Sequence, residues 1–488
     1  MAYRDLREYV AALEQRGQLR RVLAPVGAHL EITEIVDRVV KRGGPALLFE
    51  NVHDPDGRRY PMPVLINAFG TERRMAWALG LESLDELPRK LGPLLDLIRG
   101  PLPASLGDKV RALWDLRPYA SAVPKLVGRA PCQEVVLTDD ASLDSLPVLK
   151  CWPEDGGPFI TLPLVVSRDP ATGRRNVGMY RMQVYDGRTT GMHWHRHKGG
   201  AGHYREGERQ DKRLEVAVAI GADPATVYSA SCPLPPNIDE FLVAGILNGR
   251  PLELVKCKTV DLEVPANSEI VLEGYVDPHE RRREGPFGDH TGYYSLADDY
   301  PVFHLTALTH RRDPIYAATV VGRPPQEDYF LGKATERLFL PLIQIVLPEV
   351  VDINMPAEGV FHNLVLVSIR KEHPGQAHKV MYGLWGMGQM MFAKHIVVLD
   401  ADVNLQDLSE VAWRVTNNVD ARRDLTIVDG PLDVLDHSSP LPVFGGKLGI
   451  DATRKGPADG HHREWPADIL MSPDVRALVD RRWSEYGI

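Results

Sequence analysis

The chain has 488 residues, of which 44% are hydrophobic and 25% are charged, and its formal net charge is −9. This length exceeds the size at which a single hydrophobic core stops growing, so we expect two or three domains. The composition excludes a disordered or fibrous chain, and the acidic balance argues against a nucleic-acid partner.

Helix and strand alternate in the first part of the chain. Apolar residues recur at helical spacing from Asp5 to about Arg16, with Gly17 as the expected C-cap. The same spacing returns in HLEITEIVDRVVKRGG, which leads into the strand-like PALLFENV. Residues 93–130 are rich in Pro and Leu and are interpreted as a helical linker region. We therefore expect an N-terminal α/β domain over residues 1–128.

Many short apolar runs, separated by Gly, Pro and Asp, follow between Cys132 and about Thr319. This pattern is typical of an antiparallel barrel or sandwich, and it predicts a mostly β domain over residues 129–322. The alternation then returns with a long helix predicted through KVMYGLWGMGQMMFAK, the buried strand HIVVLD and a capped terminal helix. The expected fold class is thus mixed α/β (α+β), with a C-terminal α/β domain over 323–488 that serves oligomerisation.

Four cysteines without a CxxC pair favour a reducing cytoplasm. The amphipathic N-terminus lacks the apolar core of a secretory signal, and no segment reaches the ~20 apolar residues of a membrane span. Any membrane contact is therefore expected to be peripheral.

The stretch GMHWHRHKGG places His193, His195 and His197 at alternate positions. In an extended strand these side chains share one face, about 7 Å apart, a spacing that is awkward for three ligands on one zinc ion. One histidine acting as a ligand together with distant residues is easier to build. A polar strand end with hydrogen-bonded histidines is the alternative.

Two further stretches carry groups suited to proton transfer. In EGPFGDHTGYY, glycines allow the carboxylates of Glu284 and Asp289 to face one pocket, although Asp289 capping a turn is the alternative. In NVGMYRMQVYDG, an Arg181 that points into the interior would need an anionic partner, and Glu284 would meet that need. A surface position for Arg181 is the other interpretation.

Together these stretches resemble the UbiD family of non-oxidative decarboxylases. LEITEIVDR, GGPALLFENV, CWPEDGGPFIT, EGPFGDHTGYY and GRPPQED stand in the family's order and at its spacings, and the likeness spans essentially the whole chain. The resemblance implies three domains, of which the middle one is a split β-barrel that binds prenylated FMN together with Mn²⁺ and K⁺. It also implies reversible decarboxylation of an aromatic acid.

The resemblance further implies roles for individual residues. Glu284 would transfer the proton and Arg181 would orient it, while Asp289 as the proton donor stays open as an alternative. The implied metal ligands are Asn176, His197 and Glu240. The implied cofactor contacts are Met179, Tyr180, Arg181, His193, Trp194, His195, Lys198, Gly199 and, near the phosphate, Lys394.

The branch of the family expected from the resemblance is quinone biosynthesis, with a polyprenyl 4-hydroxybenzoate or a dihydroxynaphthoate as substrate. A small aromatic or heteroaromatic acid is the alternative within the family. A flavin or nicotinamide oxidoreductase is less favoured, since no GxGxxG joins a strand to a helix. A non-catalytic metal-binding protein is the third hypothesis.

The implied partners include a flavin prenyltransferase that supplies the cofactor. The implied assembly is a homodimer or homohexamer in the cytoplasm, peripheral to the inner membrane if a prenyl tail brings it there.

Overall fold

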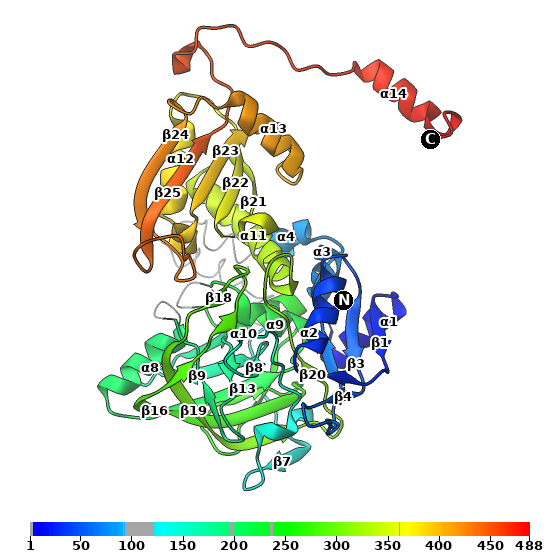
Figure 1. The fold of residues 1–488 in the computed structure, drawn as a ribbon, viewed down its shortest axis with the longest axis vertical. Coiled ribbons are helices and arrows are strands. Elements are labelled where there is room, and N and C mark those ends of the chain that lie inside the picture. Colours follow the sequence, from blue (N-terminus) through cyan, green and yellow to red (C-terminus); the bar gives the residue numbers. More distant parts are fainter. Residues whose placement is uncertain (1–2, 91, 93–121, 196–198, 235–237, 361) are drawn as a thin grey trace, which may run out of the picture.

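The structure is a computed structural model that describes residues 3–90, 92, 122–195, 199–234, 238–360 and 362–488. The described elements form three lobes and a C-terminal arm (Figure 1). The outer two lobes combine sheets with helices, and the middle lobe is built around an antiparallel sheet. The predicted mixed fold class is confirmed, whereas the linker predicted over 93–130 lies largely outside the described residues.

The N-terminal lobe begins with α1 (Leu6–Gln15), whose first turn is capped by the Asp5 carboxylate accepting the Glu8 N–H at 2.9 Å. Gly17 follows in the left-handed conformation, as predicted for the end of this helix. The other elements of the lobe are β1 (Leu19–Val22), β2 (Val26–Gly27), α2 (Glu31–Val40), β3 (Ala46–Phe49), β4 (Val52–His53), β5 (Val64–Ile66), α3 (Glu72–Ala78) and α4 (Leu87–Lys90).

Four strands form the sheet of this lobe, in the order β1–β3–β5–β20. Strand β20 (Tyr316–Ala317) arrives from the far end of the middle lobe and pairs in parallel with β5. The stretch PIYAATVVG, expected among the strands of the middle domain, therefore completes the N-terminal sheet.

The middle lobe contains a seven-stranded sheet in the order β10–β9–β13–β16–β19–β12, with β7 also paired to β19. Every pair in it is antiparallel. Its strands are β7 (Val135–Leu137), β9 (Leu164–Arg168), β10 (Arg175–Met179), β12 (Thr189–Gly191), β13 (Leu214–Ile220), β16 (Ile270–Glu284) and β19 (Asp298–His310). The many short strands predicted for this region are confirmed.

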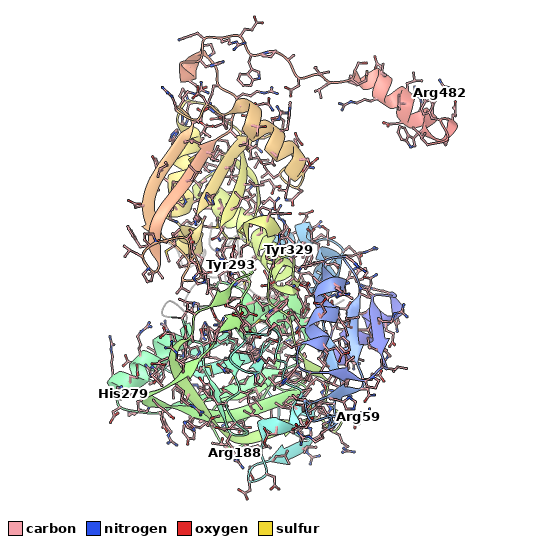
Figure 2. The ribbon with its side chains drawn as sticks, in the orientation of Figure 1. Arg59, Arg188, His279, Tyr293, Tyr329 and Arg482 are labelled. Carbon is pink, nitrogen blue, oxygen red and sulfur yellow. The ribbon has the colours of Figure 1, made fainter. Side chains whose placement is uncertain are left out.

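Smaller elements surround this sheet. They are β6 (Lys125–Leu126), β8 (Phe159–Ile160), β11 (Met182–Gln183), α8 (Gly199–Arg209), α9 (Pro224–Ser231), α10 (Glu240–Asn248), β14 (Glu253–Lys256), β15 (Glu263–Pro265), β17 (Phe287–Gly288) and β18 (Tyr294–Ser295). The β17–β18 hairpin lies on the side of the middle lobe that faces the C-terminal lobe, where Figure 2 places Tyr293 and Tyr329.

The C-terminal lobe has a five-stranded sheet in the order β21–β22–β23–β25–β24. The three central strands are parallel and both edge strands are antiparallel. Its elements are α11 (Glu327–Val346), β21 (Val350–Asn354), β22 (Leu364–Ile369), α12 (Gln376–Trp385), β23 (His395–Asp400), α13 (Leu408–Asn418), β24 (Leu425–Pro431), β25 (Phe444–Asp451) and, in the arm, α14 (Pro473–Arg482).

The helix predicted through KVMYGLWGMGQMMFAK is shorter than expected. Helix α12 ends at Trp385 with Gly386 as its C-cap, and a 3₁₀ helix over Gly388–Phe392 follows, in which Gly388 has a φ of +48°. Closely spaced glycines interrupt an apolar pattern that otherwise suits a helix. Among the residues that the structure describes, no helix is both long and apolar enough to cross a bilayer.

Candidate active site

The side chain of Arg181 is the centre of a buried polar network. Its Nε lies 3.4 Å from Glu284 Oε1, and its two terminal nitrogens bind the Asp289 carboxylate and, at 3.0 Å, Ser295 Oγ. The ring of Phe287 lies 4.3 Å from the guanidinium carbon. The predicted pairing of Arg181 with Glu284 is present, and the surface alternative for Arg181 is wrong.

Local chain geometry brings these groups together. Strand β16 ends at Glu284, and Gly285 turns the chain with a φ of +91°, which a side chain would disfavour. The turn leads into the β17–β18 hairpin, which carries Asp289 and ends at Ser295. One short segment thereby supplies three of the groups around Arg181.

Asp289 is held in its ionised form. Burial alone would raise the pKa of this carboxyl, but the Arg181 charge and the hydrogen bond from His290 outweigh it and lower the pKa well below the ordinary value. His290 Nδ1 lies 2.9 Å from Asp289 Oδ1. Although burial opposes it, this contact raises the pKa of His290. A carboxylate in such surroundings accepts hydrogen bonds and keeps no proton to donate.

Glu284 has different surroundings. Its side chain has no solvent exposure, and Oε1 lies 2.7 Å from His193 Nδ1 in addition to the Arg181 contact. Its other oxygen, Oε2, is buried without a hydrogen-bond partner among the described residues. A Cβ added at Gly191 would lie 2.8 Å from Oε2, so the space beside this oxygen depends on the glycine. Oε2 is thus the atom left for a bound molecule.

His193 and His195 are adjacent, but they do not belong to a strand as expected. Strand β12 ends at Gly191, and the chain then turns so that the two Nε2 atoms lie 2.5 Å apart. Burial, followed by the charge of Arg181, lowers the pKa of His193, and burial lowers that of His195 to about 3. Both rings are therefore neutral, and we assign the single hydrogen of His193 to Nδ1, so that Glu284 Oε1 accepts from His193 as it does from Arg181.

Three of the predicted cofactor contacts, Met179, Tyr180 and Trp194, lie within two residues of Arg181 or His193 along the chain. Met179 ends β10, Tyr180 Oη accepts from the Gly200 N–H at 3.4 Å, and Trp194 is buried with no hydrogen-bond partner for Nε1 among the described residues. Unpartnered polar atoms at Trp194 and Glu284 fit a polar planar ligand such as a flavin.

Two of the three predicted metal ligands lie on elements that contact each other, β10 and α10. Asn176, on β10, donates from Nδ2 to Tyr180 Oη at 3.3 Å, and its Oδ1 lies against Gly199 at the start of α8. Glu240, the first residue of α10, accepts the Val177 N–H at 3.1 Å. Burial raises the pKa of Glu240 to about 7. An amide oxygen and a buried carboxylate fit Mn²⁺, which would stabilise the charged carboxylate.

Three other predicted site residues are not brought into the network. His197 and Lys198 lie outside the described residues. Lys394 belongs to the C-terminal lobe, where its ammonium group lies 2.8 Å from the Asp436 carboxylate and also binds Ser438. Its role at a phosphate stays a prediction.

The C-terminal lobe contributes a group that sequence reasoning missed. His362 Nε2 lies 3.0 Å from His290 Nε2 and so extends the chain of contacts from Arg181 through Asp289 into the next lobe. Burial, followed by the charge of His290, lowers the pKa of His362 to about 4. A lone histidine far along the chain gives no signal in the sequence, whereas Ser295 and His290 lie within or beside EGPFGDHTGYY.

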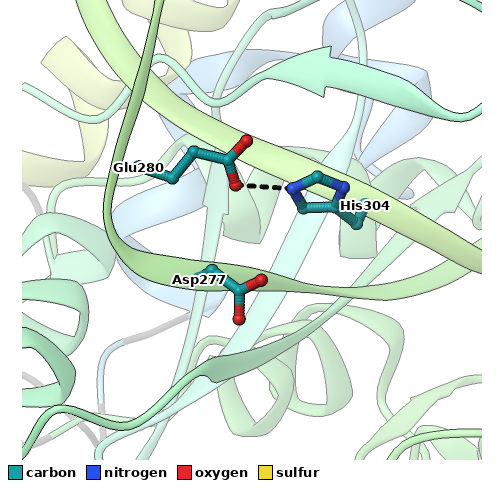
Figure 3. A group of neighbouring side chains, drawn as sticks. All are labelled: Asp277, Glu280 and His304. Carbon is teal, nitrogen blue, oxygen red and sulfur yellow. Dashed lines mark hydrogen bonds and ion pairs between the residues drawn. The ribbon is translucent and has the colours of Figure 1, made fainter.

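A second cluster of candidate ligands lies on the middle sheet (Figure 3). Carboxylates of Asp277 and Glu280 and a ring nitrogen of His304 lie within 4.8 Å of one another where β16 bulges against β19. Glu280 is hydrogen-bonded to His304 at 2.6 Å, and Asp277 pairs with Arg213 at 3.0 Å. These partners already satisfy the carboxylates, so we assign the cluster no ligand.

The family of 3-octaprenyl-4-hydroxybenzoate carboxy-lyases matches the chain in three parts. Its N-terminal domain matches residues 10–92, its Rift-related domain residues 125–324 and its C-terminal domain residues 329–452. The chain belongs to the UbiD family. The predicted family and the predicted carboxy-lyase activity are thereby confirmed.

Similar proteins and structures cover nearly the whole chain. An uncharacterized protein of Archaeoglobus fulgidus is 53% identical over 99% of each chain. Vanillic acid decarboxylase of Sedimentibacter hydroxybenzoicus, in its closed form, is 30% identical with a TM-score of 0.85, covering 100% of this chain and 99% of that one. A second structure is an evolved dimeric form of the UbiD-class enzyme HmfF from Pelotomaculum thermopropionicum in complex with prFMN. It is 29% identical with a TM-score of 0.80, covering 98% of this chain and 100% of that one.

Proposed function

We propose that this UbiD protein uses prenylated FMN to decarboxylate a hydroxylated aromatic acid, reversibly and without net oxidation. The observation that carries the proposal is the buried Arg181 network, in which Glu284 Oε2 has no hydrogen-bond partner among the described residues. Family membership and the prFMN complex of HmfF support the choice of cofactor. When bound, that cofactor supplies the electron sink that an aromatic carbon needs as it loses CO₂.

The residues of the chain would orient the acid and move the proton. Arg181 lies between Glu284 and Asp289, and its guanidinium can also bind the substrate carboxylate. His193 and Arg181 both bind Oε1 of Glu284, which leaves Oε2 as the oxygen that delivers a proton to the carbon losing CO₂. Asp289 is held ionised and fixes Arg181, so we assign the proton transfer to Glu284.

For the metal we propose Mn²⁺ at Asn176 and Glu240, completed by His197, with K⁺ nearby. Both ions would neutralise the cofactor phosphate. For the substrate we propose a quinone precursor with a hydroxybenzoate or hydroxynaphthoate ring. A small acid is the second candidate, favoured by the likeness to a vanillic acid decarboxylase. We place the enzyme in the cytoplasm, with a flavin prenyltransferase as the source of its cofactor.

The test is CO₂ release by protein that is expressed with and without a flavin prenyltransferase. The substrate panel includes vanillate, 4-hydroxybenzoate, a prenylated 4-hydroxybenzoate and a dihydroxynaphthoate. We expect CO₂ from at least one hydroxylated acid, and only after expression with the prenyltransferase. No CO₂ from any acid, or equal rates with ordinary FMN, would contradict the proposal. Comparison of the prenylated with the unprenylated acids distinguishes a quinone precursor from a small acid as the substrate.

A further inference from the structure

Helix α8 lies beside the predicted metal site and is rich in glycine. Figure 1 shows it on the flank of the middle lobe near β9 and β16, and it contacts both strands as well as β10. Four of its 11 residues are glycines. A glycine inside a helix shifts the helix–coil equilibrium about fivefold towards the coil relative to alanine. The helix therefore depends on contacts with the rest of the protein to keep its place.

The first turn of α8 needs its glycines because it approaches predicted site residues closely. A Cβ added at Gly199 would lie 2.0 Å from Asn176 Oδ1, and one added at Gly200 would lie 2.5 Å from Trp194 Nε1. The Gly200 N–H also donates to Tyr180 Oη at 3.4 Å. A side chain at either glycine would push the helix away from these groups.

A hydrogen bond between α8 and the sheet fastens the helix. His203, one turn after Gly199, has its Nδ1 2.9 Å from Oγ of Ser167 on β9. Ser167 pairs with Asn176 of β10 in the antiparallel register, so both side chains project from the same face of the sheet. The bond from His203 thus holds α8 on the strand that lies directly beside Asn176.

We propose that His203 is a positioning residue for the metal and cofactor site. Its hydrogen bond to Ser167 holds α8 on the sheet, and α8 thereby keeps its first turn against Asn176 and Tyr180. Ligand binding at that turn and the fastening of α8 favour the same arrangement, so a change that loosens the helix weakens binding. The inference rests on the proposed function, because it takes Asn176 as a metal ligand and Tyr180 as a cofactor contact.

A serine beside a histidine is also the arrangement of a nucleophile and its base. Ser167 does not suit that role here. It is 1% exposed, and β9 lies between β10 and β13 in the sheet. A substrate has no access to the hydroxyl, so the pair serves to hold helix and strand together.

The test measures the affinity of the full chain for FMN, by quenching of flavin fluorescence, at one fixed Mn²⁺ concentration. His203→Phe removes the hydrogen bond and has a similar helix propensity. Since one hydrogen bond changes an equilibrium by about three- to tenfold, we expect FMN binding to weaken by that factor. His203→Asn returns a polar group within reach of Ser167 and should recover part of the loss. His373→Phe, which removes an exposed histidine of the C-terminal lobe, should bind FMN as the parent does.

Two further variants test the route of the effect. Ser167→Ala should weaken binding as His203→Phe does, and the double variant should lose no more than either single one, because both remove the same bond. Gly202→Ala should strengthen binding by up to about fivefold, since a Cβ there meets nothing within 4 Å and alanine favours the helix. Additive losses in the double variant, or the parent's affinity in Gly202→Ala, would overturn the proposal.

Hydrogen exchange of the ligand-free protein separates this inference from the proposed function. We expect the α8 amides to exchange faster in His203→Phe than in the parent, with no change in the sheet of the C-terminal lobe. FMN should slow their exchange in the parent. A parent that binds no FMN would contradict the proposed function. A parent that binds FMN, with His203→Phe equal to it in affinity or in α8 exchange, would overturn the positioning role of His203.

Discussion

Glu284 and Asp289 are close in sequence and both bind Arg181, yet the fold gives them different tasks. Asp289 accepts from Arg181 and His290 and therefore stays ionised, whereas one oxygen of Glu284 has no hydrogen-bond partner among the described residues. The resemblance to the UbiD family implied that these three residues act together, and the glycines beside them allow both carboxylates to face one pocket. It left the proton donor open, because the hydrogen bonds of each oxygen depend on residues far along the chain.

Glu284→Gln is expected to lower kcat by about 10²–10⁴-fold, the usual loss when a general acid is removed. The amide keeps the shape of the side chain, so the melting temperature should change little. Asp289→Asn should retain more activity, since it removes the negative charge that holds Arg181 and not the transferred proton. Steady-state CO₂ release from both variants checks the ranking. The opposite order of residual activities would assign the proton to Asp289.

His193 is expected to position Glu284. His193→Phe removes the donor to Oε1 and should reduce kcat by about 10-fold or more, which corresponds to about 1.4 kcal/mol in the barrier. His193→Asn returns an N–H near the place of Nδ1 and should recover part of that loss. The comparison uses kcat and KM from initial rates with the same cofactor occupancy. If both variants lose the same activity, His193 serves packing and not the orientation of Glu284.

At the scale of elements, the sequence predicted the ends of helices and strands where a capping or turn residue marks them. Asp5 and Gly17 bound α1 as expected, and the short strands of the middle lobe follow from their turn residues. Two predictions failed for tertiary reasons. The chain leaves β12 before His193 because it must reach Glu284 on β16, and PIYAATVVG pairs with β5 although it follows the middle sheet in sequence.

The end of β12 gives the prediction at this scale. Gly191→Ala places a methyl group 2.8 Å from Glu284 Oε2 and 2.8 Å from Tyr185 Oη, so the carboxyl has to move. A displacement near 1 Å at a reacting group costs about 10²-fold in rate. The matched control is Gly446→Ala in the exposed part of β25, where a Cβ meets nothing within 4 Å. Equal activity of the two variants in the CO₂ assay would show that β12 does not constrain Glu284.

The whole molecule places the network between lobes, through the contact of His290 with His362. Overall organisation was predictable because the family motifs run through the whole chain. The contact of His362 with the middle lobe was not predictable, since it depends on how α11 and the sheet of the C-terminal lobe sit against the β17–β18 hairpin. The exposure of the C-terminal arm was not predictable either, because its sequence predicts only a capped helix.

The unfolding free energy should depend on pH through His362. Burial lowers its pKa from the ordinary 6.5 to about 4, so the unfolded chain takes up a proton that the folded chain excludes. The resulting stability is present above pH 6.5 and is lost as the pH falls towards 4. His362→Gln should make this decline shallower, by at most about 1.4 kcal/mol per pH unit.

Urea unfolding at several pH values between 4.5 and 6.5 measures this slope. The control is His373→Gln, because that histidine is exposed. If the unfolding free energy depends on pH equally in His362→Gln and His373→Gln, the fold does not prevent protonation of His362, and the prediction is wrong.

The central claim is that Glu284 delivers one proton to the carbon from which CO₂ leaves. The most direct measurement is mass spectrometry of the product formed in D₂O by the cofactor-loaded enzyme. We predict one deuterium, at the carbon that carried the carboxylate, with formation of this product strongly slowed in Glu284→Gln. Product with no deuterium at that carbon, or formation at the parent rate in Glu284→Gln, would contradict the claim.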